Sequence, residues 1–211
     1  MPGSSPKTAR RAPVESRPLL VVISGPSGVG KDALLAVLKS RGRPYHFAIT
    51  ATTRPKRGAE MDSRDYYFVT PDRFEEMAAT GELLEHALVY GHRYGVPRGP
   101  VRQALAAARD VLMRTDVQGA ATIKGTVPQA ITIFLAPASL ADLEERLRRR
   151  ATDSQETLRR RLAEARREMD TAGHFDYVVV NAEGHLEEAA DQVERIIAAE
   201  RARPERAAPV V

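Results

Sequence analysis

The chain has 211 residues, no cysteine, 43% apolar and 28% charged residues, and a formal net charge of +4. The absence of cysteine excludes disulfides, thiolate metal sites and thiol nucleophiles. No apolar run approaches the roughly 18 residues that a membrane-spanning helix needs, so length and composition predict one soluble domain with room for a small inserted subdomain.

The first 18 residues hold most of the positive charge. They carry four basic side chains against Glu15, a net charge of +3, which leaves +1 for the rest of the chain. They are rich in Pro, Ser and Arg and have little to bury, so residues 1–18 are predicted to be a disordered basic tail. The prolines oppose the amphipathic helix of a transit peptide, and no apolar segment indicates a secretion signal. We therefore expect a cytoplasmic protein.

A strand, a glycine-rich loop and a helix follow this tail. Residues 19–24 (LLVVIS) form a short apolar run typical of a strand buried on both faces, and residues 31–40 have helical spacing that ends at Gly42 and Pro44. The intervening GPSGVGK pattern directs backbone N–H groups and a helix N-terminus at phosphate oxygens, while Lys31 reaches the β and γ phosphates. The predicted ATP-binding loop comprises Gly25, Pro26, Ser27, Gly28, Val29, Gly30, Lys31 and the next residue, Asp32.

Between residues 44 and 96 the pattern changes. Residues 66–69 (YYFV) and 83–90 (LLEHALVY) are aromatic or alternating strands, and a short helix is predicted from Pro71. We interpret 44–96 as an inserted subdomain with its own small mixed sheet. The core domain then comprises residues 19–43 and 97–202, followed by a C-terminal tail at 203–211.

The remaining elements predict an α/β fold. Buried strands at 111–113, 131–135 and 177–180 alternate with helical stretches such as 101–108 and 140–150, which indicates a parallel core sheet with helices on both faces, a three-layer P-loop sandwich. The arginine-rich segment 139–170 contains nine arginines against eight acids and is therefore nearly neutral. Most of these charges are expected on a solvated helical face, so no nucleic-acid or membrane partner is predicted.

Several further motifs together resemble the guanylate kinase family. They are ATTRPKRGAEMDSRDYYFV (51–69), ELLEHALVYGHRYGVP (82–97), TDVQGA (115–120) and DYVVVN (176–181). The resemblance covers about residues 19–202 in the family's order. It implies phosphorylation of GMP, and also of dGMP, by Mg²⁺-ATP, in a P-loop core with an inserted GMP-binding subdomain and a helical lid at about 146–161.

The resemblance also implies a binding site for the phosphate of GMP. The matching arginines are Arg54 and Arg57, whose forked donors suit phosphate oxygens, and the matching tyrosines are Tyr66 and Tyr94. The acceptor phosphate is largely dianionic near neutral pH, since its second pKa is about 6, so the transfer needs alignment and charge stabilisation without a general base.

Glu85 corresponds to the family's guanine-binding glutamate. It lies inside an apolar run, where an unpaired carboxylate is costly. A carboxylate can accept from guanine N1–H and the 2-amino group together, whereas adenine has neither donor, so an unmet buried acceptor rejects the wrong base. Asp116 and Thr50 match further positions on the guanine side, with Thr50 standing where a serine is usual.

The lid is expected to contribute arginines to the transferred phosphoryl group. The matching positions are Arg146, Arg150 and Arg161, whereas Arg148 and Arg149 are expected to be solvated. The resemblance places Asn181, at the end of the last strand, near the adenine of ATP.

Two departures from the family pattern concern the metal. Asp32 stands where Ser or Thr is expected after the loop lysine, and Arg114 stands where a strand usually ends in an acid. We hypothesise an exchange in which Asp32 holds Mg²⁺ directly or through water, while Arg114 pairs with Asp32 or with phosphate.

Two other functions stay open at this stage. Ribose 1,5-bisphosphate phosphokinases share the fold and can carry GKD at this loop, but they generally lack the Glu85-type residue. A catalytically inactive guanylate kinase-like interaction module tends to lose the loop lysine and glycines, which this chain keeps. The oligomeric state does not follow from the sequence.

Overall fold

A five-stranded parallel sheet forms the core of the molecule. The computed structural model describes residues 17–89, 91–149 and 155–211. The strands of this sheet are β1 (Leu20–Ser24), β2 (His46–Phe47), β7 (Val111–Arg114), β8 (Ile131–Pro137) and β9 (Tyr177–Asn181). Their order is β2-β7-β1-β8-β9, and every neighbouring pair is parallel. The predicted parallel core sheet is confirmed.

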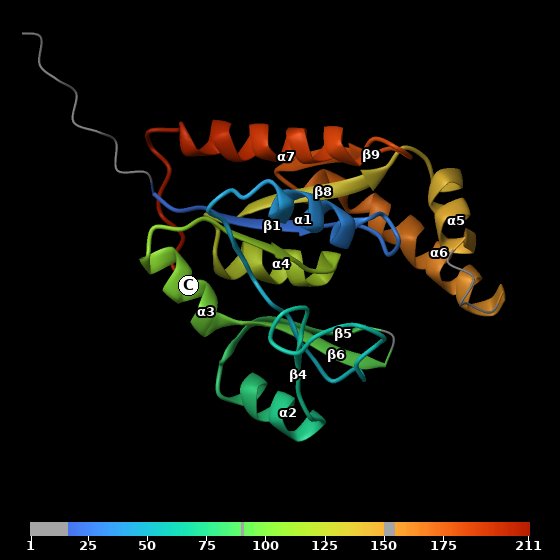
Figure 1. Ribbon diagram of the computed structural model, residues 1–211, viewed down its shortest axis with the longest axis horizontal. Coiled ribbons are helices and arrows are strands. Elements are labelled where there is room, and N and C mark those ends of the chain that lie inside the picture. Colours follow the sequence, from blue (N-terminus) through green and yellow to red (C-terminus); the bar gives the residue numbers. More distant parts are fainter. Residues whose placement is uncertain (1–16, 90, 150–154) are drawn as a thin grey trace, which may run out of the picture.

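Helices cover both faces of this sheet, which explains why its central strands are continuously apolar. Val21 and Ile23 of β1 pack with α1 (Lys31–Ser40) and α7 (Leu186–Arg201) on one face. Leu20 and Val22 pack with α3 (Arg98–Ala106) and α4 (Val117–Thr126) on the other face. Figure 1 shows α7 and α4 on opposite sides of the sheet.

A separate four-stranded sheet forms the inserted subdomain. Its strands are β3 (Ala51–Thr52), β4 (Tyr67–Phe68), β5 (Leu83–Val89) and β6 (His92–Pro97), in the order β4-β3-β6-β5. It is mixed, because β3 pairs parallel with β4 and antiparallel with β6. Helix α2 (Pro71–Ala79) packs on it through buried Phe74 and Met77. The predicted mixed sheet is confirmed, and in Figure 1 it lies beside the core, on the side of α4.

The boundary of the insert differs from the prediction. Strand β2 falls inside the predicted range 44–96, yet it pairs with β7 in the core sheet. Its two residues are too few to show a pattern of their own, and pairing with a distant strand assigns them to the core. The small sheet therefore begins only after β2.

Two helices and a 3₁₀ turn lie at the end of the core sheet where its parallel strands finish. They are α5 (Leu140–Arg149), α6 (Gln155–Asp170) and a 3₁₀ turn at Ala172–His174. Helices α5 and α6 project away from the sheet in Figure 1. They flank residues 150–154 of the predicted lid, which lie outside the described residues, as do residues 1–16 of the predicted N-terminal tail.

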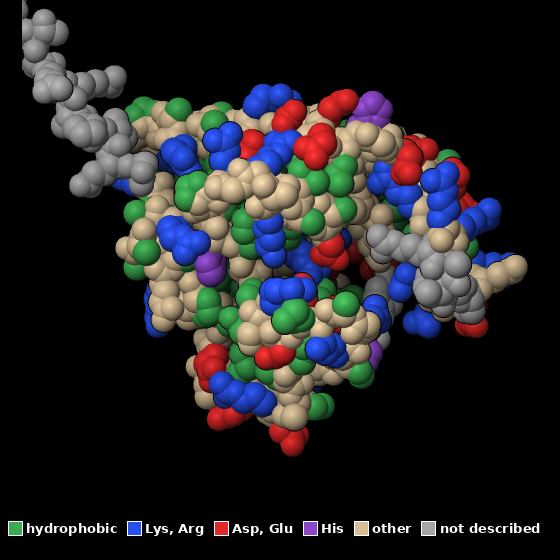
Figure 2. All heavy atoms as spheres, viewed as in Figure 1, with side chains coloured by type: hydrophobic (Ala, Val, Ile, Leu, Met, Phe, Trp, Pro, Cys, Tyr) green, Lys and Arg blue, Asp and Glu red, His purple; other side chains and the backbone are tan. Residues whose placement is uncertain are grey.

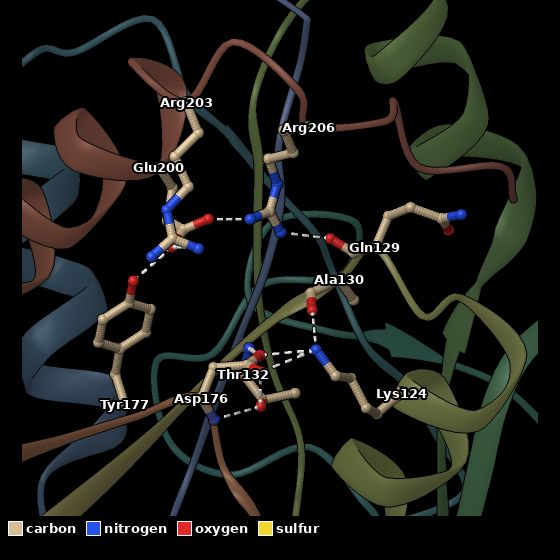
Figure 3. A network of polar contacts seen from close by, with 9 residues as sticks. All are labelled: Lys124, Gln129, Ala130, Thr132, Asp176, Tyr177, Glu200, Arg203 and Arg206. Carbon is tan, nitrogen blue, oxygen red and sulfur yellow. Dashed lines mark hydrogen bonds and ion pairs between the residues drawn. The ribbon is translucent and has the colours of Figure 1, made fainter.

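The C-terminal tail packs against the core. Arg206 contacts the carboxylate of Glu200, at the end of α7, and its Nη2 donates to the carbonyl oxygen of Gln129 at 2.5 Å (Figure 3). Arg17 Nη1 donates to the carbonyl of Arg206 at 2.8 Å, which brings the two ends of the described chain together. Val211 packs against the apolar cluster on the α4 side of the sheet.

Within the described part of the chain, no helix combines the length and apolar character that crossing a membrane requires.

Candidate active site

A cavity of about 540 Å³ lies between the core sheet and the small-sheet subdomain. The surface in Figure 2 is hollowed in this region, and acidic and basic side chains are interspersed over the visible face. Residues from the glycine loop, from the end of β7, from the small sheet and from α6 line this cavity. Among them are Ser27, Lys31, Thr50, Tyr66, Glu85, Tyr94, Arg114, Asp116, Arg160, Glu164 and Glu168.

The glycine loop joins β1 to α1 along a path that larger residues could not follow. Gly25 has a φ of +137°, and a Cβ there would lie 2.2 Å from the carbonyl oxygen of Leu135. Gly30 has a φ of +103° immediately before α1 begins at Lys31. This local geometry sets backbone N–H groups and a helix N-terminus around one concave surface, as a phosphate site requires.

Lys31 lies over this loop. Its Nζ donates to the carbonyl oxygens of Gly25 and Pro26, the latter at 3.1 Å. Burial lowers the pKa of Lys31, although the carboxylates of Glu168 and Asp32 oppose that shift. The ammonium group is thus held at the loop with little solvent around it.

Glu168 of α6 is a site residue that the sequence analysis missed. Its Oε2 accepts from the backbone N–H of Ser27 in the glycine loop at 3.3 Å. Burial raises the pKa of Glu168 to about 7, although Lys31 opposes the shift. In the sequence it is one of eight acids in a charged helical segment, so no local pattern distinguishes it.

Asn181 and Arg146 brace the glycine loop from outside the cavity lining. Asn181 is 4% exposed, and its Nδ2 donates to the carbonyl oxygen of Val29 at 2.7 Å. Arg146 donates to the same carbonyl at 3.3 Å and to the carbonyl of Asn181 at 2.8 Å. Both side chains therefore contact the backbone of the loop.

Asp32 and Arg114, the two departures from the family pattern, form an ion pair. Arg114 Nη1 lies 2.5 Å from Asp32 Oδ1, and the guanidinium carbon lies 4.9 Å from the ring centroid of Tyr66. The structure thus contains one of the two alternatives that we hypothesised for Arg114, the pairing with Asp32.

Arg54 lies beside the two predicted tyrosines. Its guanidinium carbon is 5.1 Å from the ring centroid of Tyr66, and the Tyr66 and Tyr94 rings meet edge to face at 6.3 Å. Arg54 Nη2 also donates to both carboxylate oxygens of Glu60, at 2.8 and 3.0 Å. Glu60, which the sequence analysis did not select, thereby fixes the orientation of Arg54.

Arg57 is positioned less closely. Its backbone N–H donates to Glu60 at 2.8 Å, and the residue is exposed. Glu60 therefore contacts both predicted phosphate-binding arginines, Arg54 through its side chain and Arg57 through its backbone.

Glu85 is buried at the side of the cavity. It is 6% exposed, and burial raises the pKa of its carboxyl to about 8, with a further contribution from the charge of Asp116. Asp116 caps α4 by accepting from the backbone N–H of Gly119 at 2.7 Å. A Cβ at Gly119 would lie 2.6 Å from Glu85 Oε2, so only glycine leaves room for this carboxylate. Thr50, also buried, lines the same cavity.

The predicted lid arginines are placed differently from one another. Arg146 contacts the glycine loop, Arg150 lies outside the described residues, and Arg161 lies on α6, where its neighbour Arg160 lines the cavity. Arg148 and Arg149 pair on the surface with Glu144 and Glu145, as expected.

The residues present suit a magnesium ion that is bound mainly through substrate. Over residues 17–89, 91–149 and 155–211, no three His, Asp or Glu side chains gather into a group that could hold a metal. Mg²⁺ usually keeps several waters and binds through one or two carboxylates together with substrate phosphates. Asp32, exposed and adjacent to Lys31 in the first turn of α1, fits the part of such a carboxylate.

A glycine loop between a buried strand and a helix, facing a carboxylate-lined cavity in an inserted subdomain, defines a P-loop phosphotransferase of the nucleotide kinase class. The family model described as guanylate kinase matches residues 17–200. The chain belongs to the guanylate kinase family.

Individual relatives support the same assignment. The chain is 48% identical over 188 residues to "Guanylate kinase 2, chloroplastic/mitochondrial" of Oryza sativa subsp. japonica, covering 89% of this chain and 66% of the longer relative. It is 41% identical over 188 residues to the guanylate kinase of Carboxydothermus hydrogenoformans, covering 89% and 91% of the two chains. The crystal structure of guanylate kinase from Anaplasma phagocytophilum superposes with a TM-score of 0.73 at 33% identity, over 92% of this chain and 91% of the other.

Proposed function

We propose that this protein is a guanylate kinase that transfers the γ-phosphoryl group of ATP to GMP, giving ADP and GDP, and that it also accepts dGMP. The observation that carries this proposal is that one cavity is lined both by Lys31 of the glycine loop and by the buried carboxyl of Glu85. The first suits the phosphates of a donor nucleotide and the second suits the donor edge of guanine.

Each part of the cavity has a role in this proposal. The loop N–H groups and Lys31 bind the donor phosphates, and Asn181 supports the loop from behind. Glu85, Asp116 and Thr50 bind guanine.

The phosphate of GMP is bound by Arg54 and Arg57 together with the hydroxyls of Tyr66 and Tyr94. Arg146, Arg150 and Arg161 stabilise charge on the transferred group. Bound Mg²⁺ would neutralise phosphate charge beside Asp32.

ADP release from Mg²⁺-ATP tests the reaction, with GMP, dGMP, AMP or ribose 1,5-bisphosphate as the acceptor. We expect rapid turnover with GMP and dGMP and at least a hundredfold lower kcat/KM with AMP, because adenine leaves the buried carboxyl unmatched. Turnover on ribose 1,5-bisphosphate in place of GMP would contradict the proposal, as would inactivity on all four acceptors. The identity to guanylate kinases argues against both outcomes.

The role of Asp32 in holding magnesium is tested by Asp32→Ser. If Asp32 holds Mg²⁺, this variant needs a higher Mg²⁺ concentration for half-maximal activity. The measurement is the initial rate across a Mg²⁺ titration at fixed ATP. An unchanged Mg²⁺ dependence would remove Asp32 from the metal site.

We also propose a cytoplasmic location, which fractionation of the native cells would test.

A further inference from the structure

Arg114 lies where the donor loop and the acceptor site meet. It ends β7, and its Cα is in register with Ile23 of β1, the strand that leads into the glycine loop. Its side chain is 22% exposed and lines the same cavity as Lys31, Tyr66 and Tyr94. The fold therefore places a guanidinium group between the loop lysine and the two predicted phosphate-binding tyrosines.

Two neighbours hold this guanidinium group. Asp32 lies 2.5 Å from Nη1, and the ring of Tyr66 lies against it at 4.9 Å. Burial alone would lower the pKa of Arg114, but Asp32 and Tyr66 raise it, so the group stays cationic. A guanidinium has five N–H donors, so pairing with one carboxylate oxygen leaves donors available.

Among the described residues that line this cavity, carboxyl groups outnumber cations. The charged side chains of its described lining are the cations Lys31, Arg114 and Arg160 and the carboxyl groups Glu85, Asp116, Glu164 and Glu168, and Asp32 lies beside them. Both substrates of the proposed reaction are polyanions. A cation at the junction of the two sites therefore has a use beyond neutralising Asp32, whose side chain is 73% exposed and would be solvated without a partner.

We propose that Arg114 is a further substrate-binding residue of the kinase reaction: it binds the acceptor phosphate next to Tyr66, and Asp32 positions it. This inference rests on the proposed function, because the acceptor is taken to be GMP. It assigns a phosphate-binding arginine to a strand end, in addition to Arg54 and Arg57.

Binding of GMP and of guanosine to Arg114→Gln tests the proposal by titration calorimetry, without ATP or metal. We expect Arg114→Gln to weaken GMP about tenfold or more while guanosine, which lacks the phosphate, binds as before. Arg114→Lys keeps the charge without the fork and should recover part of the loss. Arg93→Gln is the matched control, because Arg93 lies on β6 and pairs with Glu75.

The outcomes separate this inference from the proposed function. Equal weakening of GMP and guanosine in both Arg114 variants would mean a structural role and would overturn the inference. Unchanged GMP binding in Arg114→Gln would overturn it as well. If the unaltered protein binds neither GMP nor guanosine, the proposed function itself fails.

Discussion

The carboxyl of Glu85 is protonated over much of the neutral range, because burial raises its pKa to about 8. Acceptance from guanine N1–H and the 2-amino group requires the ionised form. Binding of GMP must therefore displace a proton when the pH is below about 8. In the proposed site, the carboxyl that selects the base therefore also makes this selection depend on pH.

We expect KM for GMP to fall as the pH rises from 6.5 to 8, by up to about tenfold per pH unit, and then to level off. Initial rates at saturating ATP measure this, and calorimetry in buffers of different ionisation enthalpy counts the released proton. The range starts above the second pKa of the substrate phosphate, about 6, so that ionisation of GMP contributes little. A Glu85→Gln variant has no carboxyl to ionise there and is expected to show a flat profile with weak GMP binding. An equal slope in both proteins would contradict the assignment.

The position of Gly30 leaves no room for a side chain. A Cβ there would lie 2.6 Å from Asn181 Nδ2, the atom that donates to the loop carbonyl of Val29, and the φ of +103° is unfavourable for alanine. Gly30→Ala is expected to raise KM for ATP at least tenfold while KM for GMP changes little. Gly125→Ala in α4 is the control, because a Cβ there has no heavy atom within 4 Å. Equal effects on both substrates would indicate general damage to the fold.

Strand β5 shows how an element can depart from its own pattern. Strict alternation would bury every second residue, yet Leu83, Leu84 and Glu85 are all buried. The pairing of β5 with β6 shifts register between Leu83 and His86, and such a bulge redirects side chains. Leu83 packs with the small sheet, Leu84 packs with the core, and Glu85 lines the cavity.

Helix α5 connects the predicted lid to the glycine loop through Arg146. Arg146→Ala removes the donors to the carbonyls of Val29 and Asn181, and hydrogen bonds from charged groups each contribute about 1.5 to 3 kcal/mol. We expect about a tenfold rise in KM for ATP from the lost loop contacts, together with a lower kcat from the proposed role of Arg146 at the transferred group, both measured by initial rates at saturating GMP. Arg148→Ala is the matched control, because Arg148 is exposed and pairs with Glu144 one turn away. If both variants behave alike, Arg146 does not support the loop.

At the scale of the whole molecule, the C-terminal tail packs against the end of α7 and against the segment before β8. Glu200 is 2% exposed and is contacted by Tyr177, Arg203 and Arg206 (Figure 3). Nearby, Lys124 pairs with Asp176 at 2.8 Å and donates to the carbonyl of Ala130. The tail therefore joins α7 to the segment that leads into β8.

Removing one partner of a buried ion pair lowers the free energy of unfolding, because it leaves the other charge buried without that partner. Arg206→Ala leaves the buried Glu200 without that partner, and we expect a loss of about 2 to 4 kcal/mol in the free energy of unfolding. Arg203→Ala is the control, because Arg203 is exposed, and it is expected to cost about 1 kcal/mol or less. Urea unfolding at pH 7 gives both values. An Arg206→Ala variant as stable as the unaltered protein would show that the tail docks without stabilising the fold.

Local patterns in the sequence were enough to predict the glycine loop, the buried parallel strands, the mixed sheet of the insert and the family. Each depends on neighbouring residues: glycines at positive φ, apolar runs in strands covered on both faces, and motifs that follow one another along the chain in the order that the resemblance implies. The unusual pair Asp32 and Arg114 could also be anticipated, because each departs from a recognisable motif.

The rest depended on how distant elements pack. Strand β2 joined the core sheet through its pairing with β7, and Glu168 reached the loop because α6 lies against it. Arg160 lines the cavity next to Arg161, the position that the motif had selected, and the sequence pattern did not single out Arg160. Contacts between segments more than a hundred residues apart leave no local periodicity, so only the folded chain could show that Glu168 and the glycine loop meet.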